Sequence, residues 1–538
     1  MPNRAVRLLL LFSLTLLALA RPPLTASPQP ADPPIRLVLL IAVDQLRYDY
    51  LVRFRSGFQH GFDRLLTRGA VFTNAFHDHY PTVTAVGHAT MLTGATPAVS
   101  GIIGNDWFDR TLGKNVTSVA DPATQTVGGT PGAGASPHRL LVSTLGDELK
   151  GAPFGAAPSR VFGLSLKDRS AILMAGHRAD GAYWFDSRTG ALVTSTFYRA
   201  EPHAWAAAFN ARRPADAFAG RLWPFAGGPE GTGRVMPAAP GAQLYGAIAG
   251  SPYGNDLLLA FAETALEHEA LGQRTATDLL SVSFSSNDSV GHSWGPDSPE
   301  VRDISIQTDR AIGRLLDKVD ALVGLGRTVV VLTADHGVAP VPEELAAHRM
   351  PGGRMTRDEL FGPIESALAG RFGAGQWILG TAGSSPYLNY ALIAEKGLDA
   401  ADVRRVAAAA ASAVPHVARV YTRDQILQGA VPTDTIGRRV LRSYRPDRSG
   451  DLEIILDPYW MRSANGTTHG TPYVYDAHVP IVFMGPGIAP GRYHATTAVN
   501  DIAPTLAAIV GTGLPSGSDG RVLTEMLADP RPGRSTSP

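Results

Sequence analysis

The chain contains no cysteine among its 538 residues. Disulfides, thiolate metal ligands and lipid attachment through an N-terminal cysteine are therefore excluded, so any zinc ion must be held by histidine and carboxylate side chains. A net charge is also missing, because 48 basic residues balance 48 acidic ones. No electrostatic signature points to nucleic acid or to an anionic membrane surface, and we expect no nucleic-acid partner.

Long apolar runs are absent except near the N-terminus. Two arginines there precede an apolar run over residues 8–20 that ends in Ala18-Leu19-Ala20. A basic start, a short apolar run and a small-x-small end are typical of a secretory signal peptide, and the run is short for a membrane span. We predict a cleaved signal peptide over residues 1–20, a proline-rich leader over 21–34, and a periplasmic or secreted protein without stable membrane insertion. An uncleaved anchor stays open as the alternative.

A repeated pattern places a polar residue where an apolar, β-rich run stops. The runs cover residues 35–43, 161–166, 279–284 and 328–333, and the polar residues at or just after their ends are Asp44, Lys167, Asp288 and Asp335. Such apolar strands are typical of a parallel sheet buried on both faces. Because the carboxyl ends of parallel strands meet at one edge, we expect these side chains to share one ligand-binding crevice.

Histidines accompany two of these aspartates. Asp288 and His292 lie four residues apart, which places both on one face of a helical turn. Asp335 and His336 are adjacent and precede Gly337, at an irregular junction between strand and loop. One such aspartate alone would most simply be a surface residue at a strand end. The repetition and the paired histidines favour a metal site with carboxylate and imidazole ligands.

A further segment that could take part in catalysis runs from Tyr80-Pro81-Thr82-Val83-Thr84 to Gly94. Pro81 favours a turn, and residues 85–92 favour a short helix. Thr84 would lie at the helix N-terminus, where free N–H groups and the dipole favour an anion. Alone, Thr84 is most simply an N-cap, but a metal ion could activate its hydroxyl as a nucleophile.

Six elements occur in this order along the chain: Asp44, Pro-Thr-x-Thr-x-x-Gly-His-x-Thr-x-x-Thr-Gly at 81–94, Gly-Ile-Ile-Gly-Asn-Asp-Trp at 101–107, Asp288-x-x-x-His292, Asp335-His336-Gly337 and His469-Gly470-Thr471-Pro472. The set resembles the alkaline phosphatase superfamily, most closely its threonine-nucleophile branch of phosphate-irrepressible alkaline phosphatases and nucleotide pyrophosphatase/phosphodiesterases. The resemblance implies an α/β fold, an alkaline-phosphatase-like core with a largely parallel central sheet flanked by helices, plus inserted cap elements.

The resemblance also implies two zinc ions per chain. The ligands of one would be Asp44, Asp335, His336 and the Thr84 oxygen, and those of the other would be Asp288, His292 and His469. Thr84 would attack phosphorus and form a phosphothreonine intermediate, and Asn105 would donate to a phosphoryl oxygen. His478 competes with His469 for the ligand role; we favour His469, because it precedes a glycine in an irregular loop whereas His478 borders an apolar run.

Lys167 and Arg169 decide the substrate class. On an extended segment residues two apart point the same way, so we expect both cations to face the crevice and to favour the extra negative charge of a phosphate monoester. The chain has only five lysines, which weakens the alternative of a solvated basic turn. We therefore predict an alkaline phosphatase acting on small-molecule phosphate monoesters. A phosphodiesterase or nucleotide pyrophosphatase is the first alternative, and a non-catalytic phosphoester-binding protein the second.

The predicted site residues extend over most of the chain, so we expect one catalytic domain at 35–527 rather than several domains. Two insertions are predicted within it, a cap at about 171–252 and a small αβ element at about 398–450. Gly/Pro-rich stretches at 121–137 and 226–252 are interpreted as connections or inserted loops, and residues 528–538 as a disordered tail. Nothing in the sequence indicates an oligomeric state.

Overall fold

The computed structural model describes residues 35–152, 158–225 and 232–528. Its largest element is an eleven-stranded sheet with the order β22-β2-β21-β14-β1-β13-β8-β9-β10-β6-β7. The strands are β22 (Gly491–Tyr493), β2 (Ala70–Phe72), β21 (Ile481–Met484), β14 (Thr328–Thr333), β1 (Leu37–Val43), β13 (Asp278–Phe284), β8 (Val161–Ser165), β9 (Gly181–Asp186), β10 (Ala191–Ser195), β6 (Ala120–Val127) and β7 (Ala133–Ala135). The predicted signal peptide and leader, and the predicted tail beyond residue 528, lie outside the described residues.

The five central strands, from β14 to β9, are parallel. Every residue of β1, β13 and β14 is buried, as the near-continuous apolar runs predict for strands covered on both faces. Antiparallel strands flank this centre, with β21 on one side and β10 on the other. The predicted α/β fold with a largely parallel central sheet is therefore confirmed, with antiparallel pairs towards both edges.

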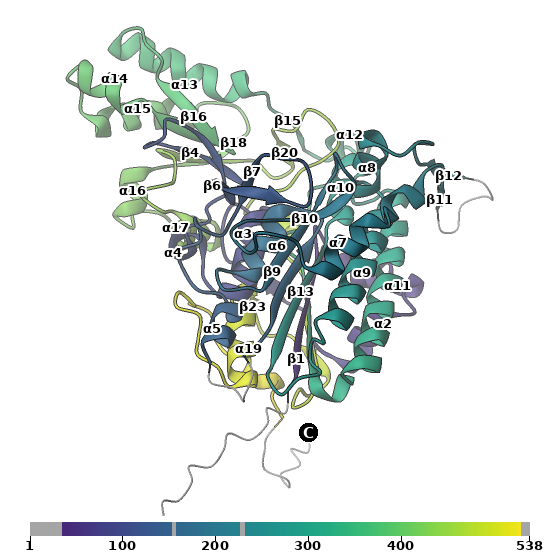
Figure 1. Ribbon diagram of the computed structural model, residues 1–538. Helices are drawn as coiled ribbons and strands as arrows, with labels where there is room; N and C mark the ends of the chain where they lie inside the picture. The colour runs from purple at the N-terminus through teal and green to yellow at the C-terminus, as the bar shows by residue number, and fades with distance from the viewer. Residues whose placement is uncertain (1–34, 153–157, 226–231, 529–538) are drawn as a thin grey trace, which may run out of the picture.

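Helices cover both faces of the sheet (Figure 1). One face carries α2 (Gly61–Arg68), α9 (Pro252–His268) and α11 (Pro299–Leu322), and the other carries α3 (Thr84–Thr93), α5 (Leu145–Gly151), α6 (Asp168–Ala175) and α19 (Ile502–Val510). α11 begins where the Ser298 hydroxyl accepts a hydrogen bond from Val301 N–H, as an N-cap serine does. Among the described residues, none of the helices combines the length and apolar composition needed to cross a bilayer.

A lobe with its own apolar core extends from the sheet domain (Figure 1). It contains α13 (Arg357–Phe372), β16 (Ile378–Ala382), β17 (Ser385–Leu388), α14 (Tyr390–Glu395), α15 (Ala400–Ser412), β18 (Val417–Thr422) and β19 (Leu452–Leu456). Phe361, Leu388 and Ile454 are among its buried residues. The αβ element predicted at 398–450 includes α15 and β18 of this lobe; its limits, and those of the predicted cap, stay predictions.

Shorter elements connect these parts. They are α1 (Tyr48–Arg53), β3 (Ala75–Phe76), α4 (Pro97–Ser100), β4 (Asp106–Asp109), β5 (Lys114–Thr117), α7 (Ala204–Ala211), β11 (Leu222–Pro224), β12 (Gly233–Val235), α8 (Ala242–Ala249), α10 (Ser286–Trp294), α12 (Pro342–Ala347), β15 (Gly353–Arg354), α16 (Arg423–Leu427), α17 (Thr435–Ser443), β20 (Trp460–Met461), α18 (Val474–Ala477) and β23 (Thr497–Ala498). α10 directly follows β13, so it starts at the edge of the sheet where the central parallel strands end.

Candidate active site

The predicted polar residues converge at the carboxyl ends of β8, β13, β1 and β14, which are neighbours in the sheet. Asp44 directly follows β1, and Asp335 lies two residues beyond β14. Asp288 is in the first turn of α10, and Lys167 precedes α6. Parallel pairing thus brings together four residues that the sequence separates by up to 291 positions, from Asp44 to Asp335.

One group of candidate metal ligands surrounds His336. Its Nε2 lies 3.5 Å from Asp44 Oδ1 and 3.3 Å from Asp335 Oδ2. Thr84 is the first residue of α3, and its Oγ1 lies 3.4 Å from the same nitrogen. All four side chains are buried. The hydroxyl predicted as the nucleophile therefore lies against the residues predicted to share its metal ion.

A second group is centred on Asp288. His292 Nε2 lies 3.1 Å from Asp288 Oδ1, as the four-residue spacing on α10 predicts, and His469 Nε2 lies 3.7 Å from the same oxygen. The His469 ring stacks on His336 with centroids 3.4 Å apart. Ligating atoms of Asp288, His292 and His469 lie within 4.8 Å of one another, as do those of Asp44, Asp288 and His336. Asp288 thus lies close to residues of both groups, so the two groups adjoin.

The three histidines share one hydrogen-bonding arrangement. Each Nδ1–H donates to a backbone carbonyl: His292 to Thr467, His336 to Gly337 and His469 to Thr82, at 2.7, 2.9 and 2.8 Å. Such a bond fixes the tautomer and leaves the Nε2 lone pair for a metal. Burial also lowers the pKa of His336 and His469, which favours the neutral, ligating form of both rings.

Charge at the site also fits a bound cation. Burial raises the pKa of Asp44 well above its usual range, and the nearby Asp335 raises it further. Asp44 Oδ1 and Asp335 Oδ2 are buried without a hydrogen-bond partner among the described residues, and Asp44 Oδ2 is paired with the Lys167 ammonium. Buried carboxylates in this state are costly unless a cation pairs with them. Carboxylates and imidazoles, with the Thr84 hydroxyl beside them, are donors that fit a divalent metal ion.

Lys167 is the protein's own cation at this position. Its Nζ lies 2.7 Å from Asp44 Oδ2 and 2.6 Å from Asp288 Oδ2. Burial alone would raise the pKa of Asp288, but the Lys167 ammonium and His292 outweigh it and hold that pKa well below the usual range. Lys167 therefore contacts one carboxylate of each metal group.

Arg169 departs from the predicted geometry. The expectation that Lys167 and Arg169 project together from an extended segment is wrong, because α6 starts at Asp168 and places Arg169 in its first turn. The Arg169 Nε is buried and has no hydrogen-bond partner among the described residues, and the Arg169 charge acts on the Asp106 carboxyl beside Asn105. The two cations therefore approach the site from different backbone environments.

The Asn105 side chain is hydrogen-bonded to the first turn of α3. Its Oδ1 accepts a hydrogen bond from Ala85 N–H at 2.8 Å, so the side chain lies beside the helix N-terminus that carries Thr84. His478 lies elsewhere: its Nε2 donates to the Thr73 carbonyl, and its ring stacks on Tyr48 and Phe76. His478 is thus held by Thr73, Tyr48 and Phe76, whereas His469 Nε2 lies 3.7 Å from Asp288 Oδ1.

Gln45 contacts both groups, although no sequence pattern singles it out. Its backbone N–H donates to Asp335 Oδ1 at 3.1 Å, and its Nε2 donates to Asp288 Oδ1 at 2.7 Å. Gln45 has φ +68°, a conformation that is unusual for a residue other than glycine and that persists where surrounding contacts fix it. A β-carbon on Gly291 would lie 1.6 Å from Gln45 Oε1, so α10 packs tightly on this side chain.

His88, in the motif that contains Thr84, was also given no role. Its Nδ1 donates to the Thr84 carbonyl at 2.8 Å and lies 3.3 Å from Asp335 Oδ2. Gly87 beside it allows this contact, since an added β-carbon would lie 2.2 Å from the Asp335 carbonyl oxygen. The glycine and histidine of the motif thus hold the start of α3 against the end of β14.

Comparison with known proteins agrees with this architecture. The family model for type I phosphodiesterase / nucleotide pyrophosphatase matches residues 38–478. Alkaline phosphatase PafA of Elizabethkingia meningoseptica is 36% identical over 92% of this chain and 95% of its own. A Myroides odoratus protein named calcium-transporting ATPase is 35% identical over 91% of this chain and 94% of its own. Alkaline phosphatase PhoV of Synechococcus elongatus is 36% identical over 91% of this chain and 93% of its own.

The crystal structure of PafA superposes with a TM-score of 0.85 at 35% identity, over 94% of this chain and 100% of PafA. A solved PafA variant carries substitutions at a threonine, an asparagine, a lysine and an arginine. These positions follow one another at the same spacing as Thr84, Asn105, Lys167 and Arg169. The chain belongs to the type I phosphodiesterase / nucleotide pyrophosphatase family, within the alkaline phosphatase superfamily.

Proposed function

We propose that this chain is an alkaline phosphatase, a hydrolase of phosphate monoesters that acts through a phosphothreonine intermediate on Thr84. The observation that carries the proposal is the position of the Thr84 hydroxyl at the start of α3, 3.4 Å from Nε2 of His336, a residue of one candidate metal group. The near full-length similarity to alkaline phosphatases supports the substrate class.

We assign two zinc ions to the two groups. Asp44, Asp335, His336 and the Thr84 oxygen would hold one, and Asp288, His292 and His469 the other. Bound metal would lower the pKa of the Thr84 hydroxyl and stabilise charge on the leaving oxygen. Thr84 would then attack phosphorus in line, while the start of α3 faces the phosphoryl oxygens. Asn105, Lys167 and Arg169 would bind those oxygens through their N–H groups, and water would release phosphate from Thr84.

Two alternatives are separated by one assay. A phosphodiesterase of the same family would prefer diesters, and a binding protein without turnover would hydrolyse neither ester. Steady-state hydrolysis of para-nitrophenyl phosphate and bis(para-nitrophenyl) phosphate by zinc-loaded protein distinguishes the three cases. ATP belongs in the same panel, because one relative is named as an ATPase. Preference for the monoester supports the proposal, and preference for the diester overturns it.

Export of the chain is part of the proposal. Cleavage after the apolar run at 8–20 would release a periplasmic or secreted enzyme. Because the chain has no cysteine, the oxidising conditions outside the cytoplasm would form no disulfides in it. N-terminal sequencing of the protein from cell fractions tests this step. A mature N-terminus near residue 21 is expected, and an intact N-terminus in the membrane fraction would favour the anchor.

Loss of one ligand should lower the metal content towards one ion per chain. We expect this for His469→Ala, because the Asp288 group then keeps only two of its side chains, and chelation of the wild type should abolish activity. Inductively coupled plasma mass spectrometry on purified protein measures the stoichiometry. His478→Ala is the matched control and should keep two ions. Two ions in His469→Ala together with one in His478→Ala would transfer the ligand role to His478.

Gln45 should affect metal affinity without being a ligand. Its amide orients Asp288 and its backbone N–H orients Asp335, and partners of this kind are typically worth about 10–100-fold in metal affinity. Gln45→Ala is expected to weaken zinc binding in a competition titration with a chelator. Gln45→Gly removes the same side chain and relieves the positive φ, so an equal loss in both variants assigns the effect to the amide. Unchanged affinity in both would contradict this role.

A further inference from the structure

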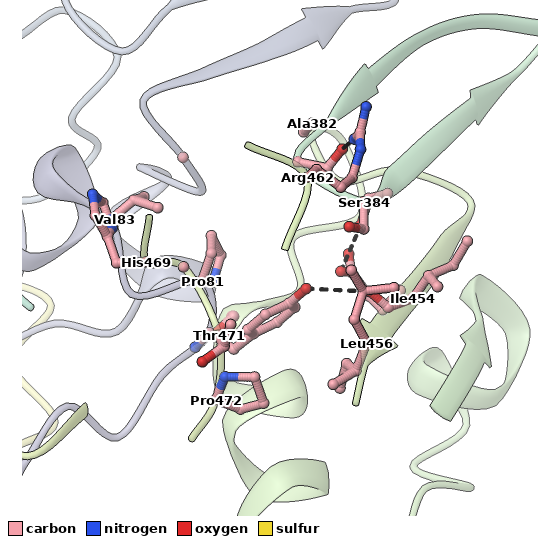
Figure 2. A pocket seen from close by; sticks show the side chains of 18 of the residues that line it. Pro81, Val83, Ala382, Ser384, Ile454, Leu456, Arg462, His469, Thr471 and Pro472 are labelled. Carbon is pink, nitrogen blue, oxygen red and sulfur yellow. Dashed lines mark hydrogen bonds between the residues drawn. The ribbon is translucent and has the colours of Figure 1, made fainter. Parts of the chain in front are cut away.

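A cavity of about 440 Å³ adjoins the active site. His469, Asn105 and Val83 line it from the sheet domain, and Ile454 and Leu456 of β19 line it from the lobe. Figure 2 shows Val83 and His469 on one side and Ile454, Leu456 and Ser384 on the other. A group attached to a phosphoryl centre beside Thr84 and Asn105 would therefore have this space available between the domain and the lobe.

The walls of the cavity are mainly apolar and aromatic. Tyr80, Tyr387, Tyr444, Trp460 and Tyr475 contribute rings. Small-molecule sites commonly combine apolar walls of this kind with a few polar groups that fix orientation. Burial of an apolar alcohol here would be favourable, because it removes apolar surface from water on both sides.

Glu453 is the acidic side chain that the lobe contributes to this cavity. Its Oε2 accepts a hydrogen bond from Ser385 Oγ at 2.6 Å, and its other oxygen accepts none from the described residues. Burial raises the pKa of Glu453 to about 7, so the carboxyl is ionised in the alkaline range. An ionised carboxylate among apolar walls is stabilised by a cation that approaches it.

The other charged residues of the lining do not neutralise Glu453. Arg462 donates to the Gly383 carbonyl and lies 5.0 Å over the Phe361 ring, and it forms no ion pair with Glu453 within the described chain. Asp106 lies at the phosphoryl end, where the Arg169 charge acts on it. The lobe side of the cavity thus presents a carboxylate oxygen that accepts no hydrogen bond from the described residues, within a lining rich in aromatic residues, which attract an ammonium group.

We propose that this cavity holds the alcohol part of the substrate and selects phosphate monoesters of apolar, aryl-type alcohols that carry an ammonium group, which Glu453 binds. The proposal rests on the proposed phosphatase function, since Thr84 and Asn105 define the phosphoryl end. It assigns to the lobe a role in substrate choice. The phosphoryl transfer itself is unchanged: phosphate passes to Thr84 and the alcohol leaves through the cavity.

The test compares para-(aminomethyl)phenyl phosphate with para-methylphenyl phosphate at a pH above the pKa of Glu453 and below that of the benzylic ammonium group, so that both charges are present. In Glu453→Gln the kcat/KM for the aminomethyl ester, divided by that for the methyl ester, should fall by about tenfold or more, because a charge-assisted contact is lost. Intrinsic reactivity cancels, since the same two esters are compared in both enzymes. Glutamine still accepts the Ser385 hydrogen bond, and Glu395→Gln, an exposed change in the same lobe, is the matched control. An unchanged ratio overturns the assignment of Glu453.

A second variant tests the cavity itself. Ser384 lies on the turn between β16 and β17 and lines the cavity (Figure 2), so Ser384→Trp would fill it from the lobe without altering the metal ligands. We expect kcat/KM for both aryl esters to fall by about tenfold or more, while inhibition by inorganic phosphate stays unchanged. Unaltered aryl ester hydrolysis overturns the cavity as the alcohol site. Wild-type protein that hydrolyses neither ester overturns the phosphatase function itself.

Discussion

Replacement of Thr84 by alanine is expected to lower kcat/KM for a phosphate monoester by a factor on the order of a thousand or more, because the attacking oxygen is lost. Metal should remain, since Asp44, Asp335 and His336 keep their side chains and their hydrogen bonds. Thr84→Ser restores a hydroxyl at the start of α3 and should recover part of the activity. Steady-state kinetics and metal analysis on the same preparations measure both effects.

Thr90→Ala provides the matched control for this prediction. Thr90 is a buried threonine on the same helix, and its hydroxyl donates to the Val86 carbonyl rather than facing the ligands. Its variant should keep nearly full turnover. Acid-quenched enzyme incubated with substrate should carry phosphate on the peptide that contains Thr84. Label on another peptide, or near-normal turnover in Thr84→Ala, would contradict the phosphothreonine mechanism.

The sheet and its site edge were predictable because their signals are local. Strands at 161–166, 279–284 and 328–333 correspond to β8, β13 and β14 within one residue at each end. Apolar runs of this kind are buried on both faces, so few competing structures exist for them. The polar residue after each run then identified the crevice, since parallel pairing fixes where the strands end.

Arg169 lies near the site as predicted, but it does so from the first turn of a helix and not from an extended segment. The prediction kept the backbone extended from Lys167 to Arg169, but α6 begins at Asp168. The sequence does contain the signal for this change, since an acidic residue precedes the helix-forming run from Ala171 to Ala175. The stretch at 121–137, predicted to be a connection or an inserted loop, instead contributes much of its length to β6 and β7 of the main sheet.

Other features depend on contacts that no local pattern reveals. Gln45 follows Asp44 directly, yet its role comes from a positive φ and from contacts to residues more than 240 positions away. His88 is similar, because its contact with Asp335 exists only once α3 lies against β14. The cavity combines residues from residue 80 to residue 475. Tertiary packing creates these features, so the sequence alone could supply only candidates for them.

Removal of Lys167 and Arg169 together is expected to lower monoester hydrolysis by several orders of magnitude and diester hydrolysis far less. Charge-assisted hydrogen bonds contribute on the order of 1.5–3 kcal/mol each, and each 1.36 kcal/mol changes a rate by about tenfold. A dianionic monoester gains more from two cations than a monoanionic diester does. The measurement is kcat/KM for para-nitrophenyl phosphate and for methyl para-nitrophenyl phosphate in wild type and in Lys167→Ala/Arg169→Ala.

The structure adds a second expectation that separates substrate binding from metal binding. Lys167 lies 2.7 and 2.6 Å from carboxylate oxygens of Asp44 and Asp288, so its loss makes the ligand groups more negative and should preserve or strengthen cation binding. The double variant should therefore keep its metal while it loses the monoester. Lys150→Ala/Arg188→Ala removes two cations that pair with Asp180 and Asp186 instead, and it should leave both activities intact. If the double variant loses monoester and diester hydrolysis equally, Lys167 and Arg169 have a structural role. If the wild type prefers diesters, the protein is a phosphodiesterase.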